Sequence, residues 1–242
     1  MIWVCIDNTA NEHRLTVGNQ YTEILNKFAD HLILKDPLAD ENSASQIFNL
    51  AKNYKYIVAM GSGTINDLCK YVSWKLDIKY LIIASAMSMN GFASKTSSIT
   101  INCHKKSLST TLPLAILADY KILQHAPLNM NKAGLADVLC FFSCNIDLLI
   151  NQLVFLQKNH QPSIKIQRRL VFNFLKNYQK FNYNDKIFLK KLFAMIIASG
   201  YAMTMANSSS PASQSEHLIA HVLTMKYPQK THNYLHGEII AN

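Results

Sequence analysis

Four residues in the second half of the chain carry the side chains from which proteins build divalent-metal sites. They are Asp137 in AGLADVL, His217 and His221 in SEHLIAH, and His236 in LHGE. Carboxylate and imidazole ligands suit an ion such as zinc, and three protein ligands leave one coordination position open for a substrate. Each residue alone has an ordinary structural explanation, such as a helix cap or a surface histidine. Together they predict a metal site, which only a folded helical domain can assemble from positions so far apart.

The H-x-x-x-H spacing places His217 and His221 on one face of a helix. One imidazole can then bind the metal while the other reaches a ligand. Glu216 is expected to point elsewhere and need not take part. The segment lacks the H-E-x-x-H pattern of metalloproteases, so that class of enzyme is not favoured.

A candidate phosphate-binding turn lies in the first half. Gly61-Ser62-Gly63-Thr64 follows the apolar run KYIVAM and precedes the helix-compatible run INDLCKYVSWKL. Glycines allow close backbone approach, and the start of a helix offers N–H groups and a positive dipole end to a pyrophosphate. Because Asn66 stands where the dinucleotide fingerprint has its third glycine, an ordinary strand-to-helix turn stays open as the alternative.

A second polar loop follows the next apolar run, KYLIIA. Its first seven residues are Ser85-Ala86-Met87-Ser88-Met89-Asn90-Gly91, and Phe92-Ala93-Ser94 come next. Loops at the carboxyl ends of neighbouring parallel strands meet at one edge of a sheet, so we expect this loop and the glycine turn to face one crevice. A serine-rich loop that only caps the next element is the alternative.

The elements needed to position these residues fall into two halves. In the first, the β-like runs IWVCID, HLILK, KYIVAM and KYLIIAS alternate with helix-like segments 43–53 and 65–76, which is typical of parallel strands joined by crossover helices. Two more strand-like runs, SSITINC and LAILADY, flank a turn-like stretch from His104 to Thr111. This pattern predicts a Rossmann-like α/β domain over residues 1–127.

Beyond Pro127 the pattern changes to long apolar-periodic segments, around 135–158, 164–180, 185–206 and 213–225. They predict an all-α domain over residues 128–242. Its most apolar stretch, Leu135 to Leu156, contains Asp137, Asn145, Asp147 and Asn151, which are costly in lipid, so we expect a buried helix and no membrane span.

Composition bounds the class of protein. The chain has 242 residues, 49% of them hydrophobic, and its five cysteines form no C-x-x-C pair, which favours a globular protein of the cytoplasm. Its first residues lack the layout of a signal peptide. The formal net charge of +9 is concentrated in the segment from Lys165 to Lys191, which we interpret as solvated helix faces, because no nucleic-acid-binding motif accompanies it.

Four blocks of sequence resemble the sn-glycerol-1-phosphate dehydrogenase family, which is related to glycerol dehydrogenase, dehydroquinate synthase and the iron-containing alcohol dehydrogenases. In chain order the blocks are GSGTINDLCKYVSWKL, ASAMSMNGFAS, AGLADVL and SSSPASQSEHLIAH, and LHGE follows them. The resemblance spans nearly the whole chain. SPASQSEH is its most specific part and GSGT its least specific.

The resemblance implies a reaction and a set of site residues. The reaction is the reversible reduction of dihydroxyacetone phosphate to sn-glycerol 1-phosphate with NADH or NADPH, a step of phospholipid biosynthesis. Asp137, His217 and His236 would bind zinc, with nickel or iron as alternatives, and Asp137 and His221 would be catalytic and contact the substrate. The cofactor would lie against residues of the two loops: Gly61, Ser62, Gly63, Thr64, Ile65, Ser85, Ala86, Met87, Ser88 and Ser94.

Two features depart from the family pattern. Asn90 stands where the family usually has an aspartate that contacts substrate, and an amide keeps the shape of that side chain but loses its charge. The chain also ends shortly after His236, whereas the family continues into further helices, so we expect an incomplete helical domain.

These departures leave alternatives open. One is another polyol dehydrogenase of the same superfamily, and another is an inactive remnant that still binds nucleotide and metal. The expected partner is a small phosphorylated ketone or polyol, not nucleic acid, and a homodimer is left open.

Overall fold

The computed structural model describes residues 2–7, 30–183 and 185–241. Two compact units form along the chain, the first from Met1–Ala86 and Thr96–Pro127 and the second from Met87–Lys95 and Leu128–Asn242. The third change of unit falls after Pro127, the position predicted for the domain boundary. The segment Met87–Lys95 was expected in the dinucleotide-binding half but belongs to the second unit.

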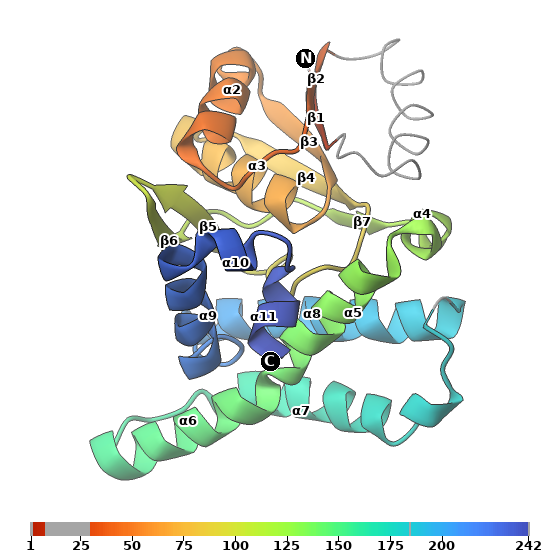
Figure 1. Ribbon diagram of the computed structural model, residues 1–242, viewed down its shortest axis with the longest axis vertical. Helices are drawn as coiled ribbons and strands as arrows, with labels where there is room; N and C mark the ends of the chain where they lie inside the picture. The colour runs from red at the N-terminus through yellow and green to blue at the C-terminus, as the bar shows by residue number, and fades with distance from the viewer. Residues whose placement is uncertain (1, 8–29, 184, 242) are drawn as a thin grey trace. The chain divides into compact units, whose positions relative to one another are not determined.

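A five-stranded parallel sheet forms the centre of the first unit, which confirms the predicted fold class (Figure 1). Its strand order is β2-β1-β3-β4-β7. The strands are β1 (Ile2–Asp7), β2 (Asp30–Leu34), β3 (Tyr56–Gly61), β4 (Lys79–Ala84) and β7 (Ile116–Ala118). Ile57 in β3 and Ile82 in β4 are completely buried, as expected of strands whose faces are covered.

Among the residues that the structure describes, the helices of this unit are α2 (Glu41–Ala51), α3 (Gly63–Leu76) and α4 (Tyr120–His125). Helix α3 packs on β1, β3 and β4, and α2 packs against α3. The fully buried Ile65 and Leu68 lie on α3. Asp40 caps α2, because its side chain accepts a hydrogen bond of 2.8 Å from the backbone N–H of Ser43.

A separate antiparallel hairpin corrects the expectation of a turn-like stretch at 104–111. Strands β5 (Thr96–Ile101) and β6 (His104–Ser109) pair through the register Ile101↔His104. Asn102 and Cys103 connect them, both with positive φ, as in the type I′ turns that favour two-residue hairpins. The sequence of β6, HKKSLS, is mostly polar and exposed, so it lacks the apolar alternation that announces a strand.

The second unit is helical, as predicted. Its helices are α5 (Leu128–Leu139), α6 (Phe141–Phe155), α7 (Gln161–Leu175), α8 (Lys186–Ala206), α9 (Ser215–Lys226), α10 (Pro228–Thr231) and α11 (His236–Ala241), with a 3₁₀ turn η1 at Tyr178–Lys180. Helix α5 packs against α8 and α11, α7 packs against α8, and α9 packs against α6 and α11. The helix expected at 135–158 is therefore the end of α5 followed by α6.

Helices α7 and α8 carry the basic segment. Their apolar residues Phe174 and Phe188 are buried, and their rings lie 5.9 Å apart. Arg168, Arg169 and Lys190 are exposed. This arrangement agrees with the interpretation of the basic residues as solvated helix faces.

Close backbone contacts hold Met87–Lys95 in the second unit. A Cβ atom added to Gly134 of α5 would lie 1.8 Å from the carbonyl oxygen of Met87, so only glycine allows the loop to lie this close to the helix. The backbone N–H of Met87 donates to Asn131 over 3.2 Å, and the Thr204 hydroxyl donates to the carbonyl of Ala93 over 3.0 Å.

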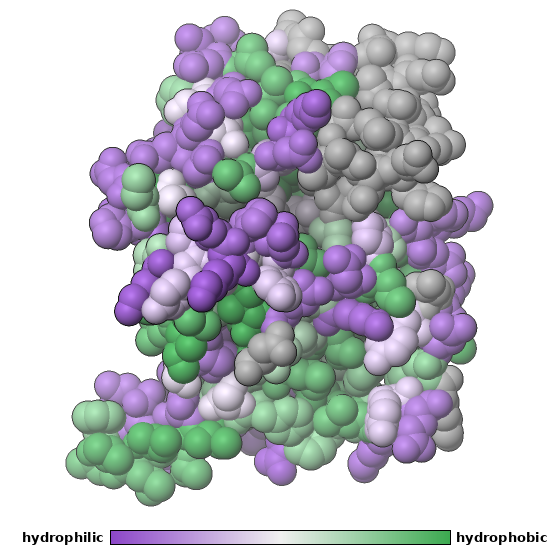
Figure 2. Space-filling view, in the orientation of Figure 1, coloured by the Kyte–Doolittle hydropathy of each residue, from purple (hydrophilic) through white to green (hydrophobic). Residues whose placement is uncertain are grey.

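Helix α6 corrects the expectation that the stretch 135–156 is a buried helix. Apolar side chains along it are exposed: Ile146, Leu149, Ile150, Leu153, Val154, Phe155 and Leu156. Figure 2 shows the hydrophobic surface that they form at the lower left, over α6. Hydrophobicity predicts burial only where another element covers the face, and α6 packs mainly on α7 and α9.

Two helical stretches are long and apolar enough to cross a membrane by length and composition, Leu128–Phe155 and Lys186–Ala206. The core helices of globular proteins pass the same test, and 56% of the second stretch is buried inside the fold. They do not establish a membrane span.

Candidate metal and cofactor sites

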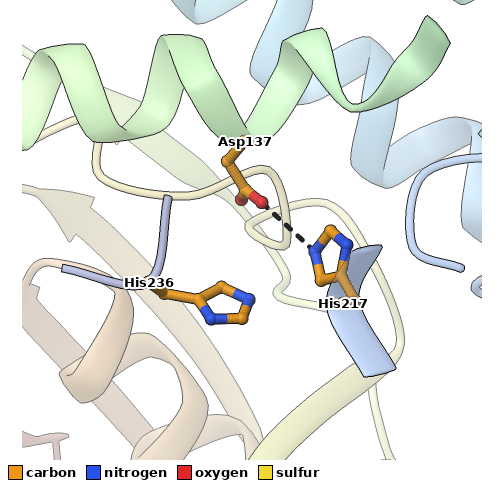
Figure 3. A group of neighbouring side chains, drawn as sticks. All are labelled: Asp137, His217 and His236. Atoms are coloured by element: carbon orange, nitrogen blue, oxygen red, sulfur yellow. Dashed lines mark ion pairs between the residues drawn. The ribbon is translucent and has the colours of Figure 1, made fainter. Parts of the chain in front are cut away.

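Asp137, His217 and His236 come together in the second unit. Each offers one ligand atom, and the three atoms lie within 4.8 Å of one another. In Figure 3 the three side chains point toward one another from α5, α9 and α11. Nε2 of His217 lies 3.2 Å from Oδ1 of Asp137. The residues that the sequence selected as ligands thus converge from three helices.

Helix packing delivers His236 to this position. Helix α11 begins at His236, and a Cβ atom added to the next residue, Gly237, would lie 1.9 Å from the carbonyl oxygen of Ala133. Ala133 lies about one helical turn before Asp137 on α5. Glycine therefore allows the start of α11 to rest directly on α5, beside the carboxylate.

The third imidazole, that of His221, lies close to the other two. Its ring centroid is 6.5 Å from that of His217 and 5.5 Å from that of His236. His217 and His221 share one face of α9, as their spacing predicted, and His221 is half-buried. It is placed to reach a molecule bound beside the other two histidines.

The carboxylate of Asp137 is almost completely inaccessible, at 1% exposure. Its Oδ2 accepts a hydrogen bond of 2.6 Å from the backbone N–H of Asn90. Its Oδ1 is buried and, among the described residues, receives no well-aligned hydrogen bond, although Nε2 of His217 lies 3.2 Å away. A buried carboxylate oxygen without a donor is costly unless a cation faces it. The site therefore fits a divalent ion held by Asp137, His217 and His236.

The position of Glu216 corrects the expectation that its side chain points elsewhere. Its Oε1 lies 2.7 Å from Nδ1 of His217, on the side of the imidazole opposite Asp137. In an ideal helix, adjacent residues point in different directions. At the first turn of α9 the flexible Glu216 side chain instead reaches the neighbouring ring.

The two carboxylates change the ionisation of His217. Burial acts to lower the pKa of His217, but the carboxylates of Asp137 and Glu216, each close to one ring nitrogen, outweigh this effect and raise the pKa to about 9. Burial acts to raise the pKa of Glu216, but hydrogen bonds from His217 and the backbone of Gln214 lower it to about 2. Without metal, a positively charged His217 therefore bridges two carboxylates at neutral pH.

Asn90 ties its loop to α5, the helix that carries Asp137. Its Nδ2 donates to the carbonyl oxygens of Asp137 over 3.2 Å and Ala212 over 3.0 Å, and the residue is 5% exposed. A carboxylate cannot donate these hydrogen bonds. The contacts give a physical reason for an amide at this position, and its proposed contact with substrate stays a prediction.

Two buried thiols that were not predicted as site residues adjoin the candidate metal ligands. Cys140, Cys144 and Glu216 have potential ligand atoms within 4.8 Å of one another. Hydrogen bonding to Cys144, together with burial, raises the pKa of the Cys140 thiol well above its usual range. Cys140 donates to Ala212 over 3.2 Å, and Cys144 donates to Glu216 over 3.3 Å. As thiols, both act as hydrogen-bond donors that brace the surroundings of the site. The four-residue spacing of Cys140 and Cys144, which puts both on one face of a helix, was the signal in the sequence that could have identified them.

The glycine turn lies in the first unit, between β3 and α3, as predicted. Gly61 ends the strand, Ser62 is the N-cap of the helix without a side-chain capping bond, and Gly63 begins the helix. Thr64 is partly accessible, whereas the side chain of Ile65 is completely buried, so any contact of Ile65 with a cofactor has to use its backbone.

The serine loop is divided between the two units. Ser85 and Ala86 belong to the first, where the N–H of Ser85 donates to the carbonyl of Gly61 over 2.9 Å. Three predicted cofactor residues belong to the second unit: Met87, Ser88 and Ser94. The Ser94 hydroxyl donates to the carbonyl of Gly91 over 3.0 Å. The cofactor-binding roles of both loops stay predictions.

A buried ion pair lies within the first two turns of α3. Nζ of Lys70 lies 3.7 Å from Oδ1 of Asp67 and donates to the carbonyl of Thr96 over 2.8 Å. Burial raises the pKa of Asp67 and lowers that of Lys70. This pair was not predicted. Its three-residue spacing on a predicted helix, which brings two side chains together, was the signal in the sequence that could have identified it. The pair joins the helix after the glycine turn to the hairpin.

Known proteins place the chain in a family. The sequence profile described as iron-containing alcohol dehydrogenase matches residues 2–127. A glycerol-1-phosphate dehydrogenase [NAD(P)+] of Methanococcus maripaludis is 30% identical over 236 residues, which cover 96% of this chain and 68% of that protein. The enzyme of the same name from Methanothrix thermoacetophila is 29% identical over 87% of this chain, which spans 59% of that relative's length.

Solved structures share the fold. An alcohol dehydrogenase from a Red Sea brine pool superimposes with a TM-score of 0.76 at 13% identity, covering 99% of this chain and 65% of its own. A probable glycerol dehydrogenase from Sinorhizobium meliloti gives 0.74 at 17% identity, covering 99% and 67%. The sequence match, the shared fold and the converging residues agree: the chain belongs to the glycerol-1-phosphate dehydrogenase family of the iron-containing alcohol dehydrogenases.

Proposed function

We propose that the protein catalyses the NAD(P)H-dependent, metal-dependent and reversible reduction of dihydroxyacetone phosphate to sn-glycerol 1-phosphate. The observation that carries the proposal is the convergence of Asp137, His217 and His236 within 4.8 Å, in a chain whose relatives are named glycerol-1-phosphate dehydrogenase [NAD(P)+]. The chain spans 59% of the length of the first of these relatives, so the whole reaction is inferred for it and has to be measured.

The three converging residues would hold one divalent ion, with zinc as the first expectation and nickel or iron as alternatives. When bound, the ion supplies Lewis acidity toward the ketone oxygen of the substrate. Asp137 contributes the negative charge of the site, and its buried Oδ1 is the atom that most needs a positive partner. His217 and His236 contribute neutral nitrogen ligands, which requires that His217 lose a proton when the ion binds.

His221 is the proposed proton-handling residue. The reduced carbonyl oxygen needs a proton. The half-buried ring of His221 lies next to the proposed ligands, because its centroid is 5.5 Å from that of His236. We assign it either proton delivery to the substrate oxygen or orientation of a substrate hydroxyl. Asp137 would also contact the substrate.

The dinucleotide is proposed to bind at the strand-to-helix turn of the first unit. The backbone from Gly61 to Ile65 would contact the pyrophosphate at the start of α3, and Ser85 to Ser88 and Ser94 would line its other side. The nicotinamide supplies the hydride. The proposed cofactor is NADH or NADPH, because the names of the relatives include both.

A second candidate is another polyol dehydrogenase of the same family. Asn90 favours it, because its amide donates to two backbone carbonyl groups where the family pattern has a charged aspartate. A neutral residue at this place can alter which hydroxyl groups are recognised.

A substrate panel separates the two candidates. Zinc-loaded protein would be tested for NADH and NADPH oxidation with dihydroxyacetone phosphate, dihydroxyacetone and simple ketones. The main proposal predicts the highest kcat/KM with the phosphorylated ketone. A higher kcat/KM with dihydroxyacetone or another unphosphorylated ketone would transfer the assignment to the second candidate, and no turnover by folded, zinc-loaded protein would favour an inactive nucleotide- and metal-binding protein.

The place of action follows from the same proposal. We expect a cytoplasmic protein that takes a small phosphorylated substrate, with a homodimer left to be tested by light scattering. Nucleic acid is not an expected partner.

A further inference from the structure

We propose that Glu216 is a positioning residue, which orients the imidazole of His217 so that its Nε2 faces the metal. The inference rests on the proposed function, because it takes His217 as a metal ligand. The position of Glu216 in the sequence did not predict this role.

The geometry around His217 is that of a ring held from both sides. Nδ1 lies 2.7 Å from Oε1 of Glu216, and Nε2 lies 3.2 Å from Oδ1 of Asp137. An imidazole nitrogen that donates its proton to a carboxylate leaves the other nitrogen with a lone pair for the metal. Glu216 therefore selects which nitrogen binds and limits rotation of the ring.

The Glu216 carboxylate is itself fixed by several donors. Its Oε1 accepts hydrogen bonds from the backbone N–H of Gln214 over 2.9 Å and from the thiol of Cys144 over 3.3 Å. Its Oε2 accepts one of 3.0 Å from the hydroxyl of Ser143. Both side-chain donors come from α6, so they hold the carboxylate between α6 and α9.

A purely structural explanation is that Glu216 only stabilises the start of α9. Acidic residues in the first turn of a helix do so through the helix dipole. However, α9 is held at the same end by a second acidic residue, because Asp147 of α6 accepts hydrogen bonds from the backbone N–H and the hydroxyl of Ser215. Asp147 is therefore a matched control: it links the same two helices but none of its described bonds involves His217.

The experiment measures metal affinity and coordination geometry in the full chain. Dissociation constants for zinc would be obtained by competition with a chromophoric chelator, and the visible spectrum of the cobalt(II)-loaded protein would report the geometry of the ligands. The proteins compared are wild type, Glu216→Ala, Glu216→Gln, Asp147→Asn and His217→Ala, each checked for folding by circular dichroism.

We expect Glu216→Ala to weaken zinc binding about 10–100-fold, the usual effect of removing such a partner, and to change the cobalt spectrum. Glu216→Gln should restore part of the affinity, because its amide oxygen can still accept from Nδ1. Asp147→Asn should keep the wild-type affinity and spectrum. If Glu216→Ala does not fold, Glu216→Ser, with a side chain too short to reach Nδ1, replaces it.

The outcomes separate this inference from the proposed function. If His217→Ala loses zinc while the Glu216 variants keep wild-type affinity and spectrum, the positioning role is wrong and the metal site stands. If Asp147→Asn weakens binding as much as Glu216→Ala, the effect of Glu216 comes from the start of the helix, and the inference is again wrong. If wild type binds no zinc, both proposals fall.

Discussion

Nε2 of His217 lies 3.2 Å from Oδ1 of Asp137, although the two residues belong to different helices and are far apart in the sequence. Glu216 faces the other nitrogen of the same ring. A cationic imidazole held between two carboxylates is a favourable arrangement without metal, and the loss of one proton converts it into a metal ligand. Several measurable consequences follow from this relationship and from the packing that supports it.

The stability of the metal-free protein should fall at alkaline pH. The folded-state pKa of His217, about 9, lies above its usual 6.5, so the stabilisation is complete below about pH 6.5 and is lost as pH rises through 9. Urea unfolding of metal-free protein at several pH values measures this. His217→Gln should remove the loss between pH 6.5 and 9, and an unchanged pH dependence in that variant would contradict the assignment.

The stability of the metal-free protein should also fall at acidic pH, because Glu216 loses its charge there. The pKa of Glu216, about 2, lies below its usual 4.5, so its contribution is present above pH 4.5 and is lost as pH falls toward 2. Glu216→Gln should therefore lose less free energy of unfolding than wild type over this range. An equal loss in both proteins would contradict the low pKa.

Gly237 should be essential for placing His236. In Gly237→Ala the new Cβ would meet the carbonyl oxygen of Ala133 at 1.9 Å, so α11 has to move away from α5. Overpacking of this kind costs about 1–3 kcal/mol, and the displaced His236 should bind zinc more weakly. Thermal unfolding and zinc affinity measure the two effects.

Gly91→Ala is the control for that variant. The nearest atom to a Cβ at Gly91 is Sδ of Met89 at 3.4 Å, which is the end of a flexible side chain. This variant should keep both stability and zinc affinity. Equal behaviour of the two alanine variants would show that the contact between α11 and α5 does not position the ligand.

Asn90→Asp should destabilise the fold. The amide donates to the carbonyl groups of Asp137 and Ala212, and a carboxylate oxygen would instead face these acceptors and the Asp137 side chain. Leaving buried acceptors unpaired costs about 1–3 kcal/mol. Asn177→Asp is the exposed control, because Asn177 also donates to a backbone carbonyl, over 2.9 Å, but in contact with solvent. Comparable unfolding midpoints for the two variants would contradict the structural role of Asn90.

The buried pair of Lys70 and Asp67 should support the first unit. Lys70→Met removes one charge and leaves Asp67 buried without it, which typically costs about 3–5 kcal/mol. The double variant Lys70→Met, Asp67→Asn should regain part of that loss, because the buried side chain at position 67 is then uncharged. Denaturant unfolding of the single and double variants measures the difference; a double variant less stable than Lys70→Met would contradict this explanation.

The sequence was sufficient to predict the parallel sheet and to select three residues that converge in the fold, because both leave local signals. Apolar runs such as KYIVAM and KYLIIA predict strands, and the turns and helices between them have the lengths typical of parallel sheets. The carboxylate and imidazole residues are chemically distinctive even when far apart. The family resemblance connected them before the fold brought Asp137 and His217 together.

The errors arose where the outcome depends on tertiary packing. The polar strand β6 exists through its pairing with β5, and Met87–Lys95 joins the helical unit through backbone contacts at Gly134 that no periodicity reveals. The hydrophobicity of α6 predicted burial without showing which element would cover it. The contact of Glu216 with His217 was not predicted, because helix spacing gives the direction of the Cα–Cβ bond and not the conformation of a long side chain.

The central claim is that Asp137, His217 and His236 hold one divalent ion that the reaction requires. It is tested most directly by measuring NADH and NADPH oxidation with dihydroxyacetone phosphate, using metal-free and zinc-reconstituted protein and the His217→Ala variant. We predict turnover only in the reconstituted wild type, with one zinc bound per chain. Turnover by metal-free protein, or undiminished turnover by His217→Ala, would contradict the account.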